Sequence, residues 1–278
     1  MVIEPNTYSI IIVTHNCEKH LEKAMASIKN QSLQPKQIII VDSGSEDPQY
    51  LNRYSEATII HNQSDIGFCM GNNIGYKQIS DEIEFIFFLN PDAFPSPNFA
   101  REAIEHMNTD SNCGALTGTL LGYNIESDKP TGFIDTTGIF QKWYGKWYDR
   151  DQGKEYDSER HRDTQEIPAI CAASLFCRKK ALDSTLIRNS EVMDNTFYMY
   201  KEDIDLSLRL KKKGWKLLFI PHLSTYHCRG WQRDRKKMPR EFRLCSSRNE
   251  LRIQFRKKHP IGILYSLLKH TLVKICDL

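Results

Sequence analysis

Two adjacent carboxylates, Glu202 and Asp203, stand where a helix is predicted to begin, in the stretch YKEDIDLSLRL. Acidic side chains in a first helical turn are stabilised by the helix dipole, and Asp205 and Arg209 have the spacing of an ordinary surface ion pair. The group therefore has a purely structural interpretation. The aromatic run FYMY directly before it favours a second one, because an apolar wall that excludes water raises the pKa of a carboxylate toward that of a general base.

Three further polar residues follow apolar runs: Asp42 in VDSGSED, Asp92 in FFLNPDA and His227 in TYHCRG. Asp92 either caps a helix that begins near Pro97 or holds a divalent cation, since Mg²⁺ and Mn²⁺ prefer oxygen ligands and commonly take one or two protein carboxylates. His227 is either a buried core histidine or a metal ligand. Asp42 either starts a turn or meets a ligand at a strand end.

The elements that must position these residues alternate between strands and helices. Apolar, β-branched and aromatic runs predict strands at residues 8–14, 37–42, 57–61 and 84–90. Asn16 is a good N-cap for a helix whose apolar face is formed by Leu21, Ala24, Met25 and Ile28. A second helix is predicted at Tyr76–Ser80, after the glycine-bearing loop 64–75. This order predicts a doubly wound α/β sheet, in which ligands bind at the carboxyl ends of the strands.

The pattern breaks down from Thr117 to Glu166, where we expect loops and a partly mobile excursion. Order returns at Ile167–Arg178, in a helix around Glu202–Lys212 and in the strand before His227. No internal repeat and no low-complexity linker divides the chain. The sequence therefore predicts one globular domain over residues 1–228, followed by a C-terminal extension over 229–278.

The extension carries most of the positive charge. The net charge is +3, but residues 1–200 contain 18 Lys and Arg against 28 Asp and Glu, whereas residues 201–278 contain 20 against 7. The basic run from Arg229 to Lys258 is either a solvated helical face or an interfacial segment, continued by the apolar, charge-interrupted stretch IGILYSLLKHTLVKI. The start of the chain does not resemble an export signal, and the eight cysteines lack metal spacing, so we expect a cytoplasmic protein.

Several function classes lack their defining motifs. Gly67, Gly71 and Gly75 do not form a G-x-G-x-x-G fingerprint, and no Walker-type G-K-[ST] occurs, which argues against dinucleotide oxidoreductases and P-loop enzymes. Zinc-finger spacing and RRM signatures are also missing from the basic tail. Only the positive charge of the tail favours a nucleic-acid-binding protein. Since no sequence motif accompanies that charge, we expect no nucleic-acid partner.

The order of the motifs is more specific than any one of them. VTHN, VDSGSED, IGFCMGNNIG, FFLNPDA, CAASLF, YKEDIDLSLRL and YHCRG follow one another along the chain. In this order they resemble the motifs of glycosyltransferase family 2 with the GT-A fold, and most of all its bacterial rhamnosyltransferase-type members. The resemblance covers roughly residues 8–260. It implies a Rossmann-like, mostly parallel sheet with a donor half over about 1–115 and an acceptor half over about 116–228.

The resemblance also assigns roles to individual residues. Its donor-binding positions correspond here to Thr14, Asn16, Asp42, Asn73 and Asp92. The D-x-D element of the family stands here as Asn90-Pro91-Asp92, without its first carboxylate, so that Asp92 and His227 are the expected ligands of a divalent cation. Glu202 and Asp203 match the motif that supplies the catalytic base, with Asp203 the first candidate.

The implied reaction is an inverting, metal-assisted transfer of a sugar, rhamnose being one candidate, from a nucleotide-diphosphate donor. Mg²⁺ or Mn²⁺ is the expected cofactor. The implied acceptor is a hydroxyl of a glycan or of a polyprenyl-diphosphate-linked saccharide in bacterial cell-surface polysaccharide synthesis. The basic tail then favours peripheral attachment to the anionic inner face of the cell membrane. A nucleotidyltransferase acting on a sugar phosphate is the nearest alternative enzyme.

Overall fold

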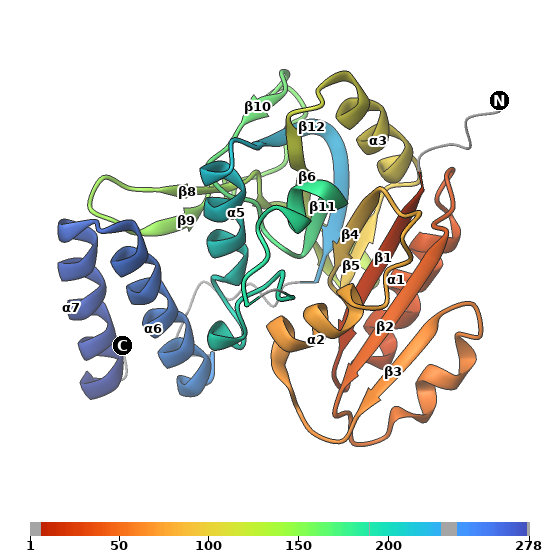
Figure 1. Cartoon of the computed structure of the whole chain (residues 1–278), viewed down its shortest axis with the longest axis horizontal. Helices are drawn as coiled ribbons and strands as arrows, with labels where there is room; N and C mark the ends of the chain where they lie inside the picture. The colour runs from red at the N-terminus through yellow and green to blue at the C-terminus, as the bar shows by residue number, and fades with distance from the viewer. Residues whose placement is uncertain (1–6, 189, 229–237, 277–278) are drawn as a thin grey trace.

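The fold is built around one large twisted sheet (Figure 1). The computed structural model describes residues 7–188, 190–228 and 238–276. From edge to edge the strands are β10 (Gln165–Glu166), β12 (Lys216–His227), β6 (Cys113–Asn124), β11 (Ser174–Arg178), β4 (Phe85–Leu89), β1 (Tyr8–Thr14), β2 (Gln37–Ser43) and β3 (Thr58–Asn62). Two more strands, β5 (Ala93–Pro95) and β7 (Lys129–Thr136), pair with β12 and β6.

The sheet is doubly wound, as the sequence predicts. Strands β4, β1, β2 and β3 run parallel, and β1 and β4 are buried at every position, so both faces need covering. One face packs against α1 (Glu18–Lys29), the 3₁₀ helix η1 (Pro48–Arg53) and α3 (Phe99–Thr109). The other packs against α2 (Gly67–Tyr76), α4 (Lys179–Asp183) and α5 (Glu202–Lys212). The apolar face predicted for α1 is confirmed, since its four residues are buried.

The expectation of loops over Thr117–Glu166 is wrong. Strand β6 extends through the first part of this stretch and is buried along most of its length, and β7 pairs with it. A hairpin of β8 (Ile139–Gln141) and β9 (Trp147–Asp149) follows. Glycines conceal β6 in the sequence: a Cβ at Gly118 would lie 2.2 Å from the backbone oxygen of Leu223 on β12. Close approach of the two strands therefore requires the residue that weakens the strand pattern.

The helix expected at Tyr76–Ser80 is wrong: α2 comprises Gly67–Tyr76, the stretch interpreted as a loop, and ends where the expected helix was to begin. A Cβ at Gly71 would lie 2.6 Å from Cγ1 of Val13, and one at Gly75 would lie 2.6 Å from Cγ2 of Ile11. Helix α2 therefore lies so close to β1 that glycine is needed at the contact. The gain from this packing outweighs the poor helix propensity of glycine, which is why propensity alone misplaced the helix.

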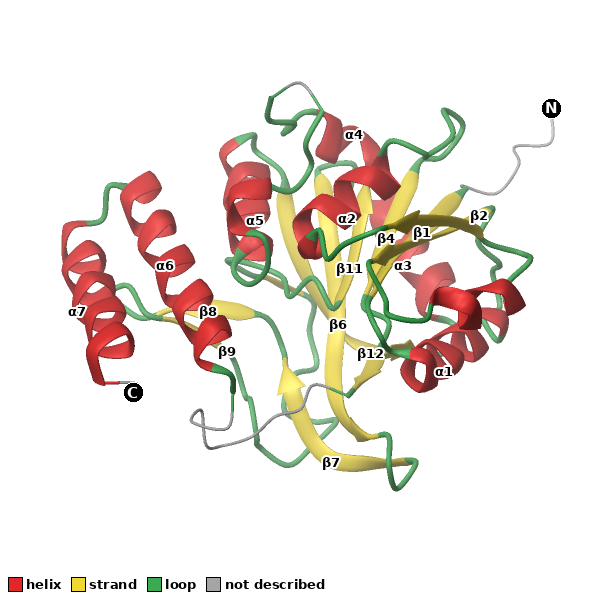
Figure 2. Ribbon diagram, turned by 90° about the horizontal axis from the view of Figure 1, so that it is seen from below, coloured by secondary structure: helices red, strands yellow, loops and turns green. Residues whose placement is uncertain are grey.

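The C-terminal extension forms two long antiparallel helices, α6 (Arg240–Lys257) and α7 (Pro260–Cys276), which lie side by side at one edge of the molecule (Figure 2). The solvated or interfacial face expected for the basic run does not describe α6, because several of its basic side chains bind the rest of the protein. Arg256, for example, pairs with Asp194 and Asp205. Arg229, Trp231, Arg233, Arg235, Lys236 and Lys237, which belong to the same predicted run, lie outside the described residues.

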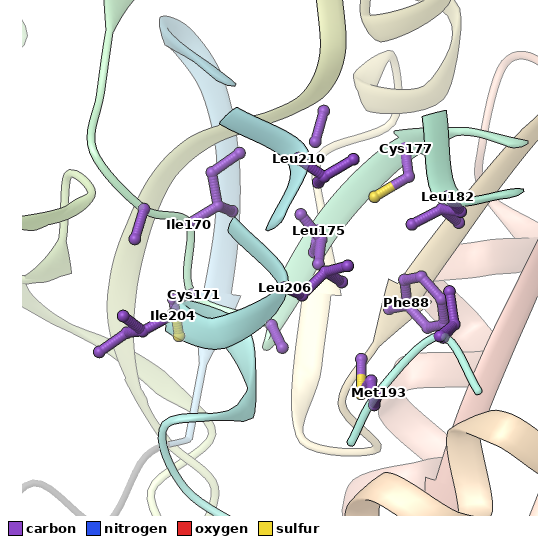
Figure 3. Close-up of a cluster of buried hydrophobic side chains, with 14 of the residues drawn as sticks. Phe88, Ile170, Cys171, Leu175, Cys177, Leu182, Met193, Ile204, Leu206 and Leu210 are labelled. Atoms are coloured by element: carbon purple, nitrogen blue, oxygen red, sulfur yellow. The ribbon is translucent and has the colours of Figure 1, made fainter. Parts of the chain in front are cut away.

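Helix α5 is fixed by its apolar side. Ile204, Leu206 and Leu210 are fully or almost fully buried and pack with residues of β11 and of the segment 170–171 that precedes it (Figure 3). The first turn of α5 therefore starts from a rigid base. This matters because Glu202 and Asp203 are its first two residues.

Asn73 connects α2 to the loop that precedes α5. Its Oδ1 accepts hydrogen bonds from the backbone N–H groups of Val192 (2.8 Å) and Met193 (2.9 Å). Its Nδ2 donates to the oxygens of Met193 (2.7 Å) and Asn195 (2.8 Å). The amide thus makes all four bonds of which it is capable, and the residue is 2% exposed. In this geometry Asn73 is a structural tie, which corrects the expectation that it contacts the donor.

Replacing Asn73 with alanine should destabilise the fold. The substitution leaves two buried backbone N–H groups without their acceptor, and each such loss costs about 1–3 kcal/mol. We expect a clear fall in the free energy of unfolding, measured by urea denaturation, with Asn72→Ala as the neighbouring control in the same helix. Unchanged stability of Asn73→Ala would contradict the structural role.

Candidate active site

Asp92 and His227 meet where two strands pair antiparallel. β5 and β12 place His227 opposite Ala93, and Cys228 N–H donates to the backbone oxygen of Asp92 (2.9 Å). The Nε2 atom of His227 lies 3.3 Å from Oδ1 of Asp92. The sequence prediction that these two residues act together therefore has a geometric basis. Asp92 does not cap a helix, since α3 begins after Asn98.

A residue that the sequence analysis missed completes this arrangement. Asp135 of β7 is buried, and its Oδ2 lies 2.8 Å from Nδ1 of His227. Burial lowers the pKa of His227, but the two carboxylates outweigh it and raise that pKa to about 10. Burial likewise raises the pKa of Asp92, yet the adjacent imidazolium brings it below its usual value. Asp135 lay in the stretch interpreted as loop, so no strand pattern pointed to it.

These side chains fit a divalent cation held together with a diphosphate, on the condition that the cation displaces the Nε2 proton of the His227 imidazolium, because a metal binds only the neutral ring. With Nδ1 bound to Asp135, the Nε2 atom of His227 is directed toward Asp92, which is how a second carboxylate commonly orients a metal-binding histidine. Asn90 Oδ1 is buried without a hydrogen-bond partner among the described residues, while its Nδ2 lies 3.5 Å from His227 Nε2. Within the described ranges no three His, Cys, Asp or Glu side chains form a metal cage. A cation here would need substrate oxygens as further ligands.

Glu202 and Asp203 differ in their surroundings. Glu202 is 6% exposed, and its Oε2 has no hydrogen-bond partner within the described chain. Burial and the neighbouring Asp203 raise its pKa to about 8. Burial also raises the pKa of Asp203, but this residue is less buried than Glu202, and its carboxylate accepts bonds from the N–H groups of Ile204 (2.8 Å) and Ala172 (3.4 Å). Asp203 is therefore the acid that ionises first.

The chain enters α5 in a strained conformation. Tyr198, Tyr200 and Lys201 have φ angles of 62°, 66° and 73°, although none of them is glycine. Each such residue costs on the order of 1–3 kcal/mol, and strain of this kind clusters at functional sites. Tyr198 also binds the start of α2: its hydroxyl donates to Asp65, and its backbone oxygen accepts from Cys69 N–H (3.0 Å). The FYMY run thus connects α2 to α5, and no pattern in the sequence indicates this connection.

The turn that carries Asp92 and the Glu202–Asp203 pair are connected through two adjacent alanines. Asn90 N–H donates to the backbone oxygen of Ala173 (3.0 Å), and the N–H of Ala172 donates to Asp203. Adjacent residues of one buried segment thus bind the Asn90-Pro91-Asp92 turn on one side and the Glu202–Asp203 pair on the other.

Thr14, Asn16 and Asp42 gather at the carboxyl ends of β1 and β2, where Thr14 is in register with Asp42. Asp42 accepts bonds from the hydroxyl (2.5 Å) and backbone N–H (3.2 Å) of Ser45. Asn16 is exposed at a φ of 47°, and its Oδ1 accepts from Glu46 N–H (2.9 Å), so it bridges two loops and does not cap α1, whose N-cap is Cys17. The structure brings these three residues together, and their contact with a donor stays a prediction.

Proteins of known structure share this fold. The chain superposes on GalNAc-T7 with UDP, GalNAc and Mn²⁺ with a TM-score of 0.67 and 16% identity, over 90% of this chain and 48% of that one. It superposes on residues 1–349 of S. aureus TarS with a TM-score of 0.58 and 15% identity, over 88% of this chain and 65% of that one. The chain therefore spans about half of GalNAc-T7. At this level of identity the likeness shows the GT-A fold alone.

Sequence comparison identifies the family. The chain is 22% identical to an N-acetylglucosaminyl-diphospho-decaprenol L-rhamnosyltransferase of Mycobacterium tuberculosis, over 78% of this chain and 75% of the relative. It is 24% identical to an uncharacterized glycosyltransferase of Haemophilus influenzae, over 81% of this chain and 66% of that protein. Residues 9–186, more than half of the chain, match Glycosyl transferase family 2. This glycosyltransferase belongs to that family.

Proposed function

We propose that this glycosyltransferase inverts the anomeric centre of a nucleotide sugar in a single displacement, with Asp203 as the general base. Residues 1–115 form the donor half in this proposal, residues 116–228 form the acceptor half, and 229–278 are an extension. The single observation that carries the proposal is the juxtaposition of the Asp92–His227 pair and the Glu202–Asp203 pair on either side of Ala172 and Ala173.

Asp203 is suited to accept the proton of an acceptor hydroxyl. The residue is intermediate in exposure, whereas Glu202 is buried and its pKa is raised to about 8, which favours its protonated form at neutral pH. One carboxylate can then take a proton while the other remains neutral. The proton leaves the hydroxyl as its oxygen attacks the anomeric carbon from the face opposite the leaving diphosphate, which inverts that carbon.

The leaving diphosphate belongs on the Asp92 side of the site. A divalent cation bound there would stabilise the negative charge that develops on the leaving oxygen. Asp92, His227 Nε2 and Asn90 Oδ1 would hold it, and Asp135 keeps the imidazole oriented. Thr14, Asn16 and Asp42 would contact the nucleoside. Arg229, a further candidate for charge neutralisation, lies outside the described residues.

The nature of the relatives supports the substrate class. The mycobacterial relative is named for rhamnose transfer to a decaprenol-diphosphate-linked N-acetylglucosamine. We therefore propose a polyprenyl-diphosphate-linked saccharide as acceptor and rhamnose as a candidate sugar, in synthesis of a cell-surface polysaccharide. A thermal-shift screen of nucleotide sugars with Mg²⁺ and Mn²⁺ tests the donor, because a ligand that binds only the folded state raises the melting temperature.

Asp203→Asn should abolish transfer while donor affinity stays within about twofold. The amide keeps the shape of the carboxylate but cannot take a proton, and loss of a general base costs about 10²- to 10⁴-fold in rate. Steady-state release of the nucleoside diphosphate measures it. Glu202→Gln is the matched control and should keep most of its turnover, since glutamine resembles the protonated acid. More than about a tenth of wild-type turnover in Asp203→Asn would point to another base.

The pH dependence of turnover follows from the same pair. A base acts in its ionised form, and burial raises the pKa of both carboxyls. Turnover should therefore fall as the pH is lowered, with a midpoint above the value of about 4 of a free carboxylate. A kcat profile that stays flat down to pH 5 would contradict a buried carboxylate base.

Cation-dependent donor binding should weaken in Asp92→Ala and in Asp135→Asn. The first loses a ligand, and the second loses the partner that orients His227, a change that typically costs about 10- to 100-fold in metal affinity. Donor titrations with and without Mn²⁺ measure the effect, with Asp128→Asn as an exposed control. If the wild type retains full activity in EDTA, protein cations neutralise the diphosphate instead.

A membrane-facing surface would suit a lipid-linked acceptor. Helix α7 exposes a row of large apolar side chains at helical spacing: Ile261, Leu264, Leu267, Leu268, Leu272 and Ile275, which are 43% to 74% exposed. Trp143, 77% exposed at the tip of the β8–β9 hairpin, lies beside this helix, since the adjacent Tyr144 ring contacts Tyr265 at 5.1 Å. Segments 141–147 and 255–276 contain seven Lys and Arg and no Asp or Glu; Arg256 and Lys269 pair with Asp194, Asp205 and Glu250, so five of the seven carry charge beyond these pairs. We propose that this surface rests on an anionic leaflet. No helix of the described chain is long and apolar enough to cross a bilayer.

Leu264→Glu combined with Leu268→Glu should release the protein from anionic vesicles in a co-sedimentation assay. Phe133→Glu, which changes another exposed apolar side chain outside α7, should not. Higher salt should weaken the wild-type binding, because the screening length falls from about 8 Å at physiological ionic strength to about 3 Å at 1 M. Wild-type protein that stays in the supernatant at low salt would contradict the membrane proposal.

A further inference from the structure

Helix α6 forms hydrogen bonds to the strained segment 197–201, which leads into the Glu202–Asp203 pair. Asn249 Nδ2 donates to three backbone oxygens of this segment, those of Phe197 (2.8 Å), Met199 (2.9 Å) and Tyr200 (3.0 Å). Asn249 is fully buried, so its two amide protons are shared among protein carbonyls and not with bulk water. One turn earlier on α6, the Cys245 thiol lies 3.3 Å from the oxygen of Met199.

The flanks of the same segment are also bound to α6. Arg252 donates to the backbone oxygen of Thr196, just before the segment. Arg256 pairs with Asp194 (2.5 Å) on one side and with Asp205 (2.5 Å), in the first turn of α5, on the other. The start, middle and end of the approach to α5 are therefore all held by one helix.

The hydrogen bonds from α6 stabilise this strained backbone. Three backbone oxygens of a segment in which Tyr198, Tyr200 and Lys201 have positive φ angles lie within hydrogen-bond distance of a single donor. The Asn249 amide supplies that donor. Without it, the segment has a reason to relax, and Lys201 immediately precedes the catalytic turn.

We propose that Asn249 is a positioning residue for sugar transfer, which holds the approach to α5 so that Asp203 stays directed at its substrate. The inference rests on the proposed role of Asp203. It also means that the C-terminal extension, outside the residues 9–186 that match the family, completes the active-site geometry.

Gln254 offers a matched control on the same helix. It is an amide, it is fully buried, and its Nε2 donates to the backbone oxygen of Gly145 (2.6 Å) in the β8–β9 hairpin, away from the catalytic approach. Alanine at position 249 or 254 therefore removes a comparable buried donor from α6. The two variants differ in which segment loses its partner.

The test compares kcat, donor KM and hydrogen exchange of Asn249→Ala and Gln254→Ala. We expect kcat of Asn249→Ala to fall about 10- to 100-fold, the usual effect of a misplaced catalytic group, with donor KM within about twofold. Gln254→Ala should keep kcat within about twofold. Amide exchange should quicken over residues 197–205 in the first variant and over 141–147 in the second. Equal losses of kcat in both, or an unchanged kcat and exchange in Asn249→Ala, would overturn the proposal.

Milder variants decide the question if Asn249→Ala does not fold. Cys245→Ala should lower kcat and quicken exchange over 197–205, whereas Cys245→Ser, which keeps a donor, should restore both toward wild type. Wild-type values in both Cys245 variants would overturn the proposal. A wild type that transfers no sugar, but whose 197–205 exchange depends on Asn249, would count against the proposed function and leave the contact of α6 with this segment intact.

Discussion

Two backbone hydrogen bonds from adjacent alanines set the geometry of this site. The oxygen of Ala173 receives the N–H of Asn90, and the N–H of Ala172 reaches Asp203. Both alanines are almost fully buried in the segment that leads into β11, at the middle of the sheet. That segment therefore connects the Asn90-Pro91-Asp92 turn to the Glu202–Asp203 pair. In the proposed reaction, this connection sets where the attacking and leaving groups lie relative to one carbon.

Burial of charge distinguishes the two sides. On the Asp92 side, His227 lies between two carboxylates, and their combined charge outweighs its loss of hydration. On the other side, burial raises the pKa of Glu202 to about 8 and also raises that of Asp203, which favours the neutral form of a carboxyl. Loss of hydration thus accompanies a charged form favoured at His227 and a neutral form favoured at Glu202. Which outcome prevails depends on whether a group of opposite charge lies within a few ångströms.

Much of this was predictable from the sequence, because long apolar runs and strand-end polar residues carry strong signals. Strands β1, β2 and β4, the start of α5 and the order of the motifs all follow from such patterns. Asp135 and the glycine-containing helix α2 did not, since both depend on close tertiary approach. The contact between Asn249 and the FYMY segment joins residues about fifty positions apart, so no periodic pattern in the sequence indicates it. For Asn73 the motif was recognised, but its four hydrogen bonds show that it ties α2 to the loop before α5.

Helix α6 shows why charge composition alone is a weak guide. Its basic residues suggested a solvated or lipid-facing surface, yet Arg252 and Arg256 bind the core of the enzyme. The exposed apolar residues lie instead on α7 and at the tip of the β8–β9 hairpin. The extension therefore combines an inner helix that binds the segment before α5 with an outer helix that faces away from it.

The anomeric configuration of the product tests the central claim most directly. A single displacement between the Asp92 side and Asp203 requires that the configuration of the transferred sugar be opposite to that of the donor. The anomeric proton and carbon couplings, followed by NMR from the first turnovers, measure this before the product can equilibrate. We predict inversion in every product molecule. Retention would require a double displacement through a covalent or ion-pair intermediate and would contradict the account.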